Sequence, residues 1–107
     1  MDLIEWKDKI GQFKLYPTPN TYTFLKLDTR FGTVEQVHWG VGDGARGSET
    51  VSYEYLARGE EAVIGRFEIQ TTDNIYNFLL IDTIDGRVWQ LQWSYDSDKR
   101  FLIGRIY

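Results

Sequence analysis

Two Asp-Thr pairs, Asp28-Thr29 and Asp82-Thr83, are the residues of this sequence with the clearest capacity for chemistry. If the fold brought their carboxylates together, the two groups could share one proton and work as an acid–base dyad. The spacing favours a simpler role. A glycine follows each aspartate by four residues, which is typical of a hairpin turn whose carboxylate accepts backbone amides. We therefore predict that both aspartates shape turns, with Gly32 and Gly86 supplying positive φ, and that the chain has no catalytic residue.

The glycine-rich stretch GDGARG, residues 42–47, formally matches a phosphate-binding G-x-G-x-x-G motif. That motif needs a helix after it, so that the helix N-terminus faces the phosphate. The residues that follow, SETVSYEYLA, alternate as in a strand and instead indicate a flexible hairpin loop. His38 is the only histidine, and there is no cysteine. Without a cluster of ligands or an orienting partner for His38, we expect no metal and no cofactor.

Gln36 and Gln90 lie between apolar neighbours at equivalent places in the chain. A glutamine in such a position either satisfies buried backbone groups or faces a ligand. Aromatic side chains nearby give the same segments the composition of a sugar-binding or protein-binding surface, or of a second small core. The candidate binding surface predicted from the sequence consists of Tyr22, Gln36, His38, Tyr76, Trp89 and Gln90.

The elements that must position these residues come from an internal repeat. Residues 11–39 align without gaps with residues 65–93, and 13 of the 29 aligned positions are identical. About two identities would be expected by chance, so the similarity indicates a duplicated unit. The sequence predicts a single domain over residues 1–107, with repeat 1 at about 11–64 and repeat 2 at about 65–107.

Each copy contains three segments with the alternation of β-strands, at 10–16, 21–29 and 33–41 and again at 64–70, 75–83 and 87–95. The middle segment is apolar on both faces, which predicts a central strand covered on both sides. Fourth strands are expected at 50–57 and 99–107, and one turn of helix at 2–9. The predicted fold is all-β: an antiparallel meander of about eight strands in two repeated units of three to four strands, barrel-like or as two packed sheets. Trp39 and Trp93 are predicted to anchor the core.

Composition narrows the classes of function. Net charge is −4, which argues against binding to nucleic acid because a phosphate backbone needs a basic surface. Aromatic residues make up 16% of the chain, a share that suits strands and interfaces equally. No apolar run resembles a signal peptide or a membrane span, so we expect no membrane association and a cytoplasmic location.

The pattern D-T-x-x-G-x-V followed by tryptophan, at Asp28, Gly32 and Trp39 and again at Asp82, Gly86 and Trp93, resembles the blade repeats of bacterial β-propellers of the tryptophan-docking type. The resemblance implies that each copy is one blade, with the aspartate and glycine in its hairpin. Two blades cannot close a propeller within one chain, so the resemblance implies a ring made from several chains.

These observations predict a small non-enzymatic binding domain with a protein partner, of the inhibitor, immunity or assembly type. A homo-oligomer that forms through an exposed strand edge is part of the same hypothesis. The alternative is a carbohydrate-binding module with two aromatic sites, one in each copy. An enzyme that uses Asp28 and Asp82 ranks third.

Overall fold

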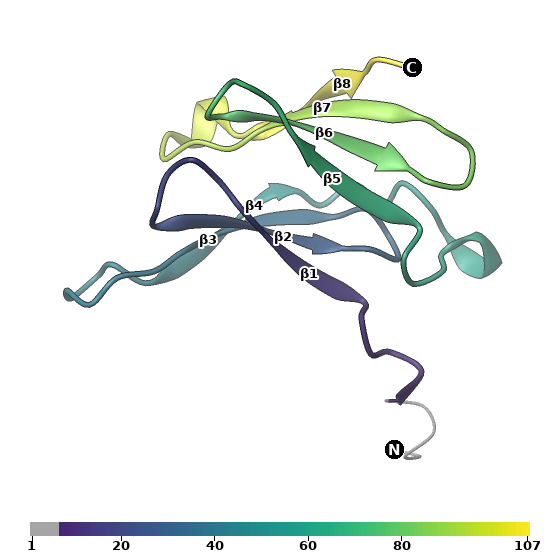
Figure 1. Ribbon diagram of the computed structural model, residues 1–107, viewed down its shortest axis with the longest axis horizontal. Coiled ribbons are helices and arrows are strands. Elements are labelled where there is room, and N and C mark those ends of the chain that lie inside the picture. Colours follow the sequence, from purple (N-terminus) through teal and green to yellow (C-terminus); the bar gives the residue numbers. More distant parts are fainter. Residues whose placement is uncertain (1–6) are drawn as a thin grey trace.

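The computed structural model describes residues 7–107, which form eight β-strands in two four-stranded antiparallel sheets. Figure 1 shows the two sheets stacked as separate layers, each with its strands in meander order. The predicted all-β meander is confirmed, in the form of two packed sheets that do not close into a barrel. The first sheet contains β1 (Phe13–Pro17), β2 (Thr23–Asp28), β3 (Val34–His38) and β4 (Gly47–Ser52), and the second β5 (Phe67–Thr71), β6 (Asn77–Asp82), β7 (Val88–Gln92) and β8 (Phe101–Arg105).

The two sheets repeat each other in register, as the duplicated sequence requires. Leu25 lies opposite Gln36 across β2 and β3, and the equivalent Leu79 lies opposite Gln90 across β6 and β7. The last strand pair of each sheet contains a register shift. It lies after Val34 between β3 and β4, and after Gln90 between β7 and β8. The internal repeat is therefore visible in structure as well as in sequence.

The hydrophobic core lies between the sheets and consists of one face from each. Strands pair so that residues directly opposite each other point to the same face. In the first sheet, the buried residues Leu25, Leu27 and Val34 form this inner face, whereas in the second sheet Phe78 and Leu80 do so. The complete core cluster is Leu25, Leu27, Val34, Val51, Ala57, Ala62, Phe67, Ile69, Phe78, Leu80, Trp89, Leu91 and Trp93.

The two copies bury opposite faces of the repeated unit. Leu25 is fully buried, but its equivalent Leu79 lies on the outer face of the second sheet and is only half-buried. Conversely, Phe67 is fully buried, and its equivalent Phe13 is 56% exposed on the outer face of the first sheet. One face of the repeated unit is buried in the first sheet, and the opposite face is buried in the second. We call this arrangement front-to-back packing, because equivalent faces of the two sheets point in the same direction.

This arrangement corrects two predictions about coverage. The central strands β2 and β6 were expected to be covered on both faces, but a two-layer structure covers only one face of each sheet. Trp39 was expected in the core with Trp93. Trp93 is fully buried, but Trp39 is 46% exposed because it lies on the face of the first sheet that points away from the second.

The remaining segments connect these strands. β4 begins three residues before the expected start at 50, because the hairpin after His38 places Gly47 directly opposite it. Single 3₁₀ turns at Gly59–Glu61 and Ser97–Lys99 precede β5 and β8. The helical turn expected at 2–9 falls mostly outside the described residues. No helix within residues 7–107 has the length and hydropathy of a membrane-spanning segment.

Candidate functional site

The two aspartates close equivalent turns at one end of the sheets. Asp28 Oδ1 accepts the backbone amides of Arg30 and Phe31 at 2.9 and 3.3 Å. Gly32, at φ +82°, donates its amide to the carbonyl of Asp28 at 2.9 Å. The Gln12 side chain donates to the same carboxylate at 3.2 Å, which connects the turn to the segment before β1.

Asp82 forms the same turn with charged partners. Its Oδ1 accepts the amides of Ile84 and Asp85, and Gly86 has φ +81°. Arg66 occupies the place of Gln12 and approaches Oδ2 at 2.8 Å, while Arg87 approaches the same oxygen at 3.0 Å. Burial alone would raise the pKa of Asp82, but the hydrogen bonds from Arg66, the turn amides and Arg87 lower this pKa to about 2.

Both carboxylates are occupied by hydrogen bonds at the turns. Each accepts hydrogen bonds from its own turn and from the segment that precedes its sheet. Among residues 7–107, no hydrogen bond joins Asp28 to Asp82. A general acid needs a pKa near the working pH, and the ion pairs of Asp82 move its pKa in the opposite direction.

The neighbouring threonine joins the two sheets. Thr29 is fully buried, and its carbonyl accepts the amide of Phe67 at 2.9 Å. Its hydroxyl accepts the amide of Gly65, also at 2.9 Å. The equivalent Thr83 is exposed. The threonine of the first copy therefore belongs to the interface between the sheets, whereas the threonine of the second copy lies at the molecular surface beside the buried Asp82.

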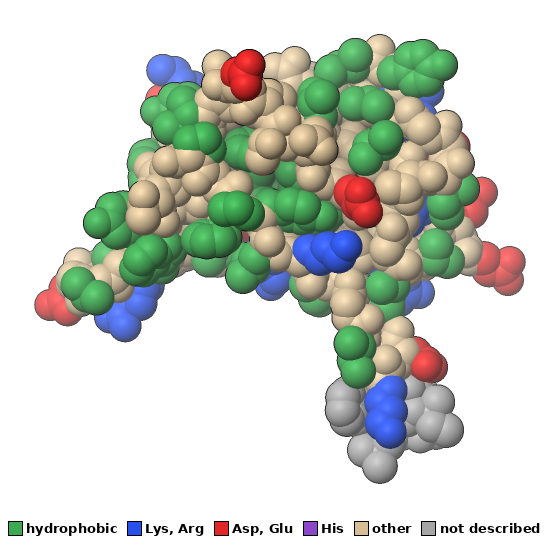
Figure 2. All heavy atoms as spheres, viewed as in Figure 1, with side chains coloured by type: hydrophobic (Ala, Val, Ile, Leu, Met, Phe, Trp, Pro, Cys, Tyr) green, Lys and Arg blue, Asp and Glu red, His purple; other side chains and the backbone are tan. Residues whose placement is uncertain are grey.

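The opposite end of the sheets carries an aromatic cluster. Tyr22 packs against Trp39 with ring centroids 5.3 Å apart, and Tyr76 packs against Trp93 at 5.1 Å. Each indole nitrogen donates to a backbone carbonyl in the loop before the second strand of its own copy. Trp39 donates to Thr21 at 2.9 Å, and Trp93 donates to Ile75 at 3.0 Å. Figure 1 shows the loops after β1, β3 and β5 at this end, on the left of the view, and Figure 2 shows hydrophobic side chains there as well as across the middle of the same face.

Tyr95 fills the space between the two aromatic pairs. Its ring stacks on His38 at 5.0 Å and meets Trp93 edge-on at 5.6 Å. Hollows of about 470 and 420 Å³ open on its two sides, the first bordered by Tyr22 and Trp39 and the second by Tyr76 and Trp93. Burial, and then the charge of Arg100, lower the pKa of His38 below its ordinary value.

Gln36, a candidate for the binding surface, is fully buried. Its Nε2 donates to the carbonyl of Ser94 at 2.7 Å, and its Oε1 accepts the amide of Ser94 at 3.2 Å. It thereby satisfies the backbone of the second sheet, which is the structural alternative considered from the sequence. Gln90, the equivalent residue, instead lies half-buried on the outer face and donates to Asn77.

Trp89, another candidate for the binding surface, is also buried, with 6% of its surface exposed. It lies opposite Leu80 on the inner face of the second sheet, where Arg87 packs over its ring. The structure therefore brings Tyr22, His38 and Tyr76 to one end of the molecule. Buried Gln36 lies directly beneath them, with its Nε2 3.0 Å from His38 Nε2. Trp89 lies on the inner face and Gln90 on the outer face of the second sheet.

The sequence did not single out an apolar surface on the first sheet. We call it the first outer face: Phe13, Leu15, Phe24, Val37 and Trp39, on the side of the first sheet that points away from the second. Four of these residues line a hollow of about 420 Å³ without polar lining atoms. Alternation in 10–16 and 33–41 was the signal for a common face, but it could not show which face would be covered.

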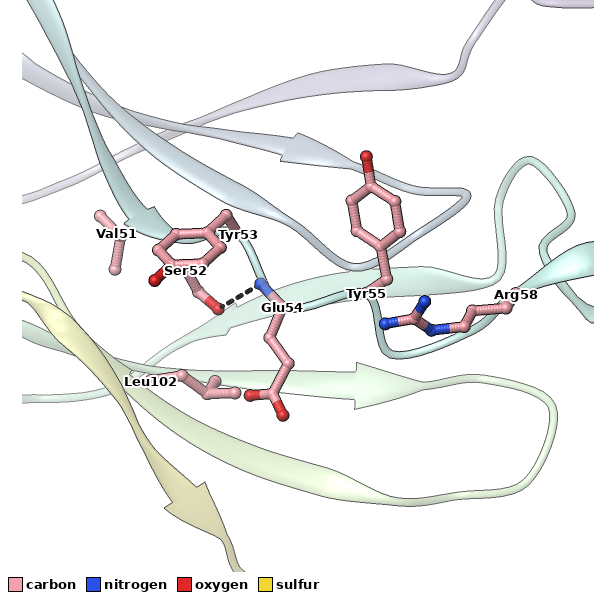
Figure 3. Close-up of a pocket in the computed structure, with 7 residues that line it drawn as sticks. All are labelled: Val51, Ser52, Tyr53, Glu54, Tyr55, Arg58 and Leu102. Carbon is pink, nitrogen blue, oxygen red and sulfur yellow. Dashed lines mark hydrogen bonds between the residues drawn. The ribbon is translucent and has the colours of Figure 1, made fainter.

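A further hollow, of about 480 Å³, lies where the ends of β4 and β8 meet. Figure 3 shows Tyr53, Tyr55 and Arg58 at its rim, with the Ser52 hydroxyl accepting the amide of Glu54 at 3.4 Å. The hollow is open and has mixed polar and apolar walls, and no cluster of catalytic groups lines it.

Comparison with known proteins adds no identification. No family model, no curated protein and no solved structure matches this chain. Within residues 7–107, no group of histidine, aspartate and glutamate side chains is arranged to hold a metal ion.

Proposed function

We propose that this chain is a small non-enzymatic interaction domain that binds protein through its first outer face. The observation that carries the proposal is the exposure of this face: Phe13, Leu15 and Trp39 are 56%, 60% and 46% exposed around an apolar hollow. Contiguous apolar and aromatic surface on a small domain is characteristic of protein interfaces. On the opposite side of the same strands, the inner face of the first sheet is covered by the second sheet. A protein partner would cover the first outer face in a similar way.

Of the types predicted from the sequence, assembly fits this surface better than inhibition of a basic target. Net charge is −4, but the only charges beside the first outer face on β2 and β3 are a balanced pair, Lys26 and Glu35, directly opposite each other on the same side of the sheet. An electrostatically steered inhibitor needs a surface of one sign at the contact. The apolar share of this face instead favours a partner with an apolar surface of its own.

The proposal is tested by site-specific photocrosslinking in cells that express the protein. A benzoylphenylalanine placed at Phe13 should form a covalent adduct with a protein partner, identified by mass spectrometry. The same probe at Tyr53, which is 84% exposed but lies outside the first outer face, is the matched control. Adducts at neither position, or equal adducts at both, would contradict a specific contact at this face.

Carbohydrate binding remains the second candidate, favoured by the two equivalent Tyr-Trp pairs beside hollows. Stacking on a sugar ring requires an exposed aromatic face. Trp93 is fully buried and Tyr76 is 44% exposed, so the pair in the second copy offers less surface than Tyr22 and Trp39. A glycan array with the wild type and a Tyr22→Ala variant tests this candidate, and loss of glycan retention in the variant would support it.

A further inference from the structure

We infer that the partner of the first outer face is the second sheet of another copy of this chain, bound head to tail. The inference rests on the proposed function and names its partner. We call the receiving surface the second outer face: Leu79, Ile81, Val88 and Gln90, on the side of the second sheet that points away from the first. The contact would repeat, between chains, the packing that joins the two sheets within one chain.

The first argument is the chemical match of the faces. Each residue of the second outer face has an equivalent in the buried inner face of the first sheet: Leu25, Leu27, Val34 and Gln36. Each residue of the first outer face has an equivalent in the buried inner face of the second sheet: Phe67, Ile69, Phe78, Leu91 and Trp93. The two exposed faces are therefore near copies of two surfaces that already pack against each other.

The second argument concerns a polar contact inside that packing. Gln36 crosses from the first sheet to the second and holds both backbone groups of Ser94. Its equivalent Gln90 lies on the second outer face, and the residue equivalent to Ser94 is Gly40. In a head-to-tail contact, Gln90 would hold the backbone of Gly40 of the second copy in the same way.

The third argument comes from the Asp-Thr pairs. Buried Thr29 accepts the amides of Gly65 and Phe67 from the second sheet. Exposed Thr83 is the equivalent acceptor, and the equivalent donors are the amides of Gly11 and Phe13 of the next copy. Gly11 already has the backbone conformation of Gly65, with φ +86° against +90°. One chain thus carries both the acceptor, Thr83, and the donors, the amides of Gly11 and Phe13, for these hydrogen bonds between copies.

The intermolecular contact differs from the intrachain one by a pair of charged residues, besides exchanges of one apolar residue for another and of Ser94 for Gly40. Lys26 and Glu35 replace the buried Leu80 and Trp89, and Lys26 lies over the ring of Phe13 with its Nζ 4.8 Å from the centroid. Desolvation of this charge pair makes the contact between chains weaker than the contact within one chain. The assembly should therefore dissociate into single chains when the protein is diluted.

A head-to-tail contact uses a different face on each copy, so every dimer retains one free face of each kind. Such heterologous contacts continue past the dimer and give a ring where the rotation closes, or a filament where it does not. An isologous contact would stop at two copies. The size of the assembly therefore separates the two arrangements.

The test uses the full chain with one face changed at a time. Leu15→Asp places a charge on the first outer face, and Ile81→Asp places one on the second. Tyr53→Asp, outside both faces, is the matched control, and circular dichroism establishes that each variant is folded. A milder variant, Gln90→Ala, removes only the polar contact on the second outer face.

Sedimentation velocity over a range of concentrations gives the masses. The wild type and Tyr53→Asp should form species larger than a dimer, and Gln90→Ala should need higher concentration to do so. Leu15→Asp and Ile81→Asp should each be monomeric alone, yet a mixture of the two should give a 1:1 dimer. In that dimer the intact face of each variant is occupied and growth stops.

Two results would overturn the inference: a wild type that is monomeric at every concentration, or a dimer that survives either face variant. Photocrosslinking at Phe13 separates this failure from failure of the proposed function. Adducts with a different protein, together with a monomeric chain, would leave the proposed function standing and remove the head-to-tail assembly. Adducts with a second copy would support both.

Discussion

Arg66 and Asp82 form a buried ion pair in which Nε and Nη2 of the arginine lie 2.9 and 2.8 Å from the same carboxylate oxygen. The equivalent pair in the first copy, Gln12 and Asp28, is joined by a hydrogen bond of 3.2 Å with no charge on the glutamine. The same turn is thus built once with an ion pair and once without, so each copy serves as a control for the other.

Asp82→Asn should destabilise the protein more than Asp28→Asn. The first change leaves the buried charge of Arg66 without its main counterion, which costs about 3 kcal/mol. The second weakens only hydrogen bonds, at about 1 kcal/mol. Urea unfolding gives both free energies. Arg66→Gln combined with Asp82→Asn, which removes the buried charge as well, should recover part of the loss, and equal losses in the two single variants would contradict this account.

Acid should destabilise the fold through Asp82 in a defined range. The pKa of Asp82 falls from 3.8 to about 2 on folding, so its ionised form stabilises the protein above pH 3.8, and this contribution disappears as the pH falls towards 2. A shift of this size corresponds to about 2 kcal/mol. Unfolding free energies measured between pH 5 and pH 2 should show the decrease in the wild type, and Asp82→Asn should lack this part of it.

His38 should add a separate pH dependence nearer neutrality. Burial, and then Arg100, lower its pKa below 6.5 in the folded state, so the unfolded chain binds a proton first as the pH falls. The free energy of unfolding should therefore decrease as the pH falls below 6.5. His38→Gln, which places the residue of the second copy in the first, should remove this decrease between pH 7.5 and pH 5.5. A proton NMR titration of the imidazole checks the direction of the shift.

Gly32→Ala should cost more stability than Gly86→Ala. Both glycines have positive φ, +82° and +81°, so an alanine at either place is strained by about 1 kcal/mol. At Gly32 the added methyl would also lie 2.9 Å from Leu56 Cδ1, whereas the space at Gly86 is open. Thermal unfolding of the two variants gives the difference. Trimming Leu56 to alanine in the Gly32→Ala background should reduce the extra cost, as a double-mutant cycle would show.

Much of the architecture could be predicted from the sequence, because alternation and turn residues act locally. The eight strands follow from a period of two, and the turns at Asp28 and Asp82 have the glycine spacing that a hairpin needs. Which face of each sheet becomes buried could not be predicted in this way. Trp39 and Trp93 have equivalent places in nearly the same local sequence, yet the first is 46% exposed and the second fully buried.

The burial of the candidate binding residues could not be predicted for the same physical reason. Gln36 and Gln90 differ in burial only because one sheet has a neighbour on that side and the other does not. Burial depends on packing between layers, which is not contained in the pattern of a single strand. Tyr22 and Tyr76 are both exposed because they follow turns at the strand ends, where exposure depends less on the neighbouring sheet.

Front-to-back packing makes the repeated unit a module of fixed length that can be added in tandem. A third unit of 54 residues appended after the second would meet Leu79, Ile81 and Gln90, a surface like the one that the second unit already meets on the first. Lengthening a gene by whole units would therefore create a correctly matched layer each time, whereas a front-to-front sandwich has no place for a third sheet. Growth of this protein by duplication requires no redesign of its interfaces.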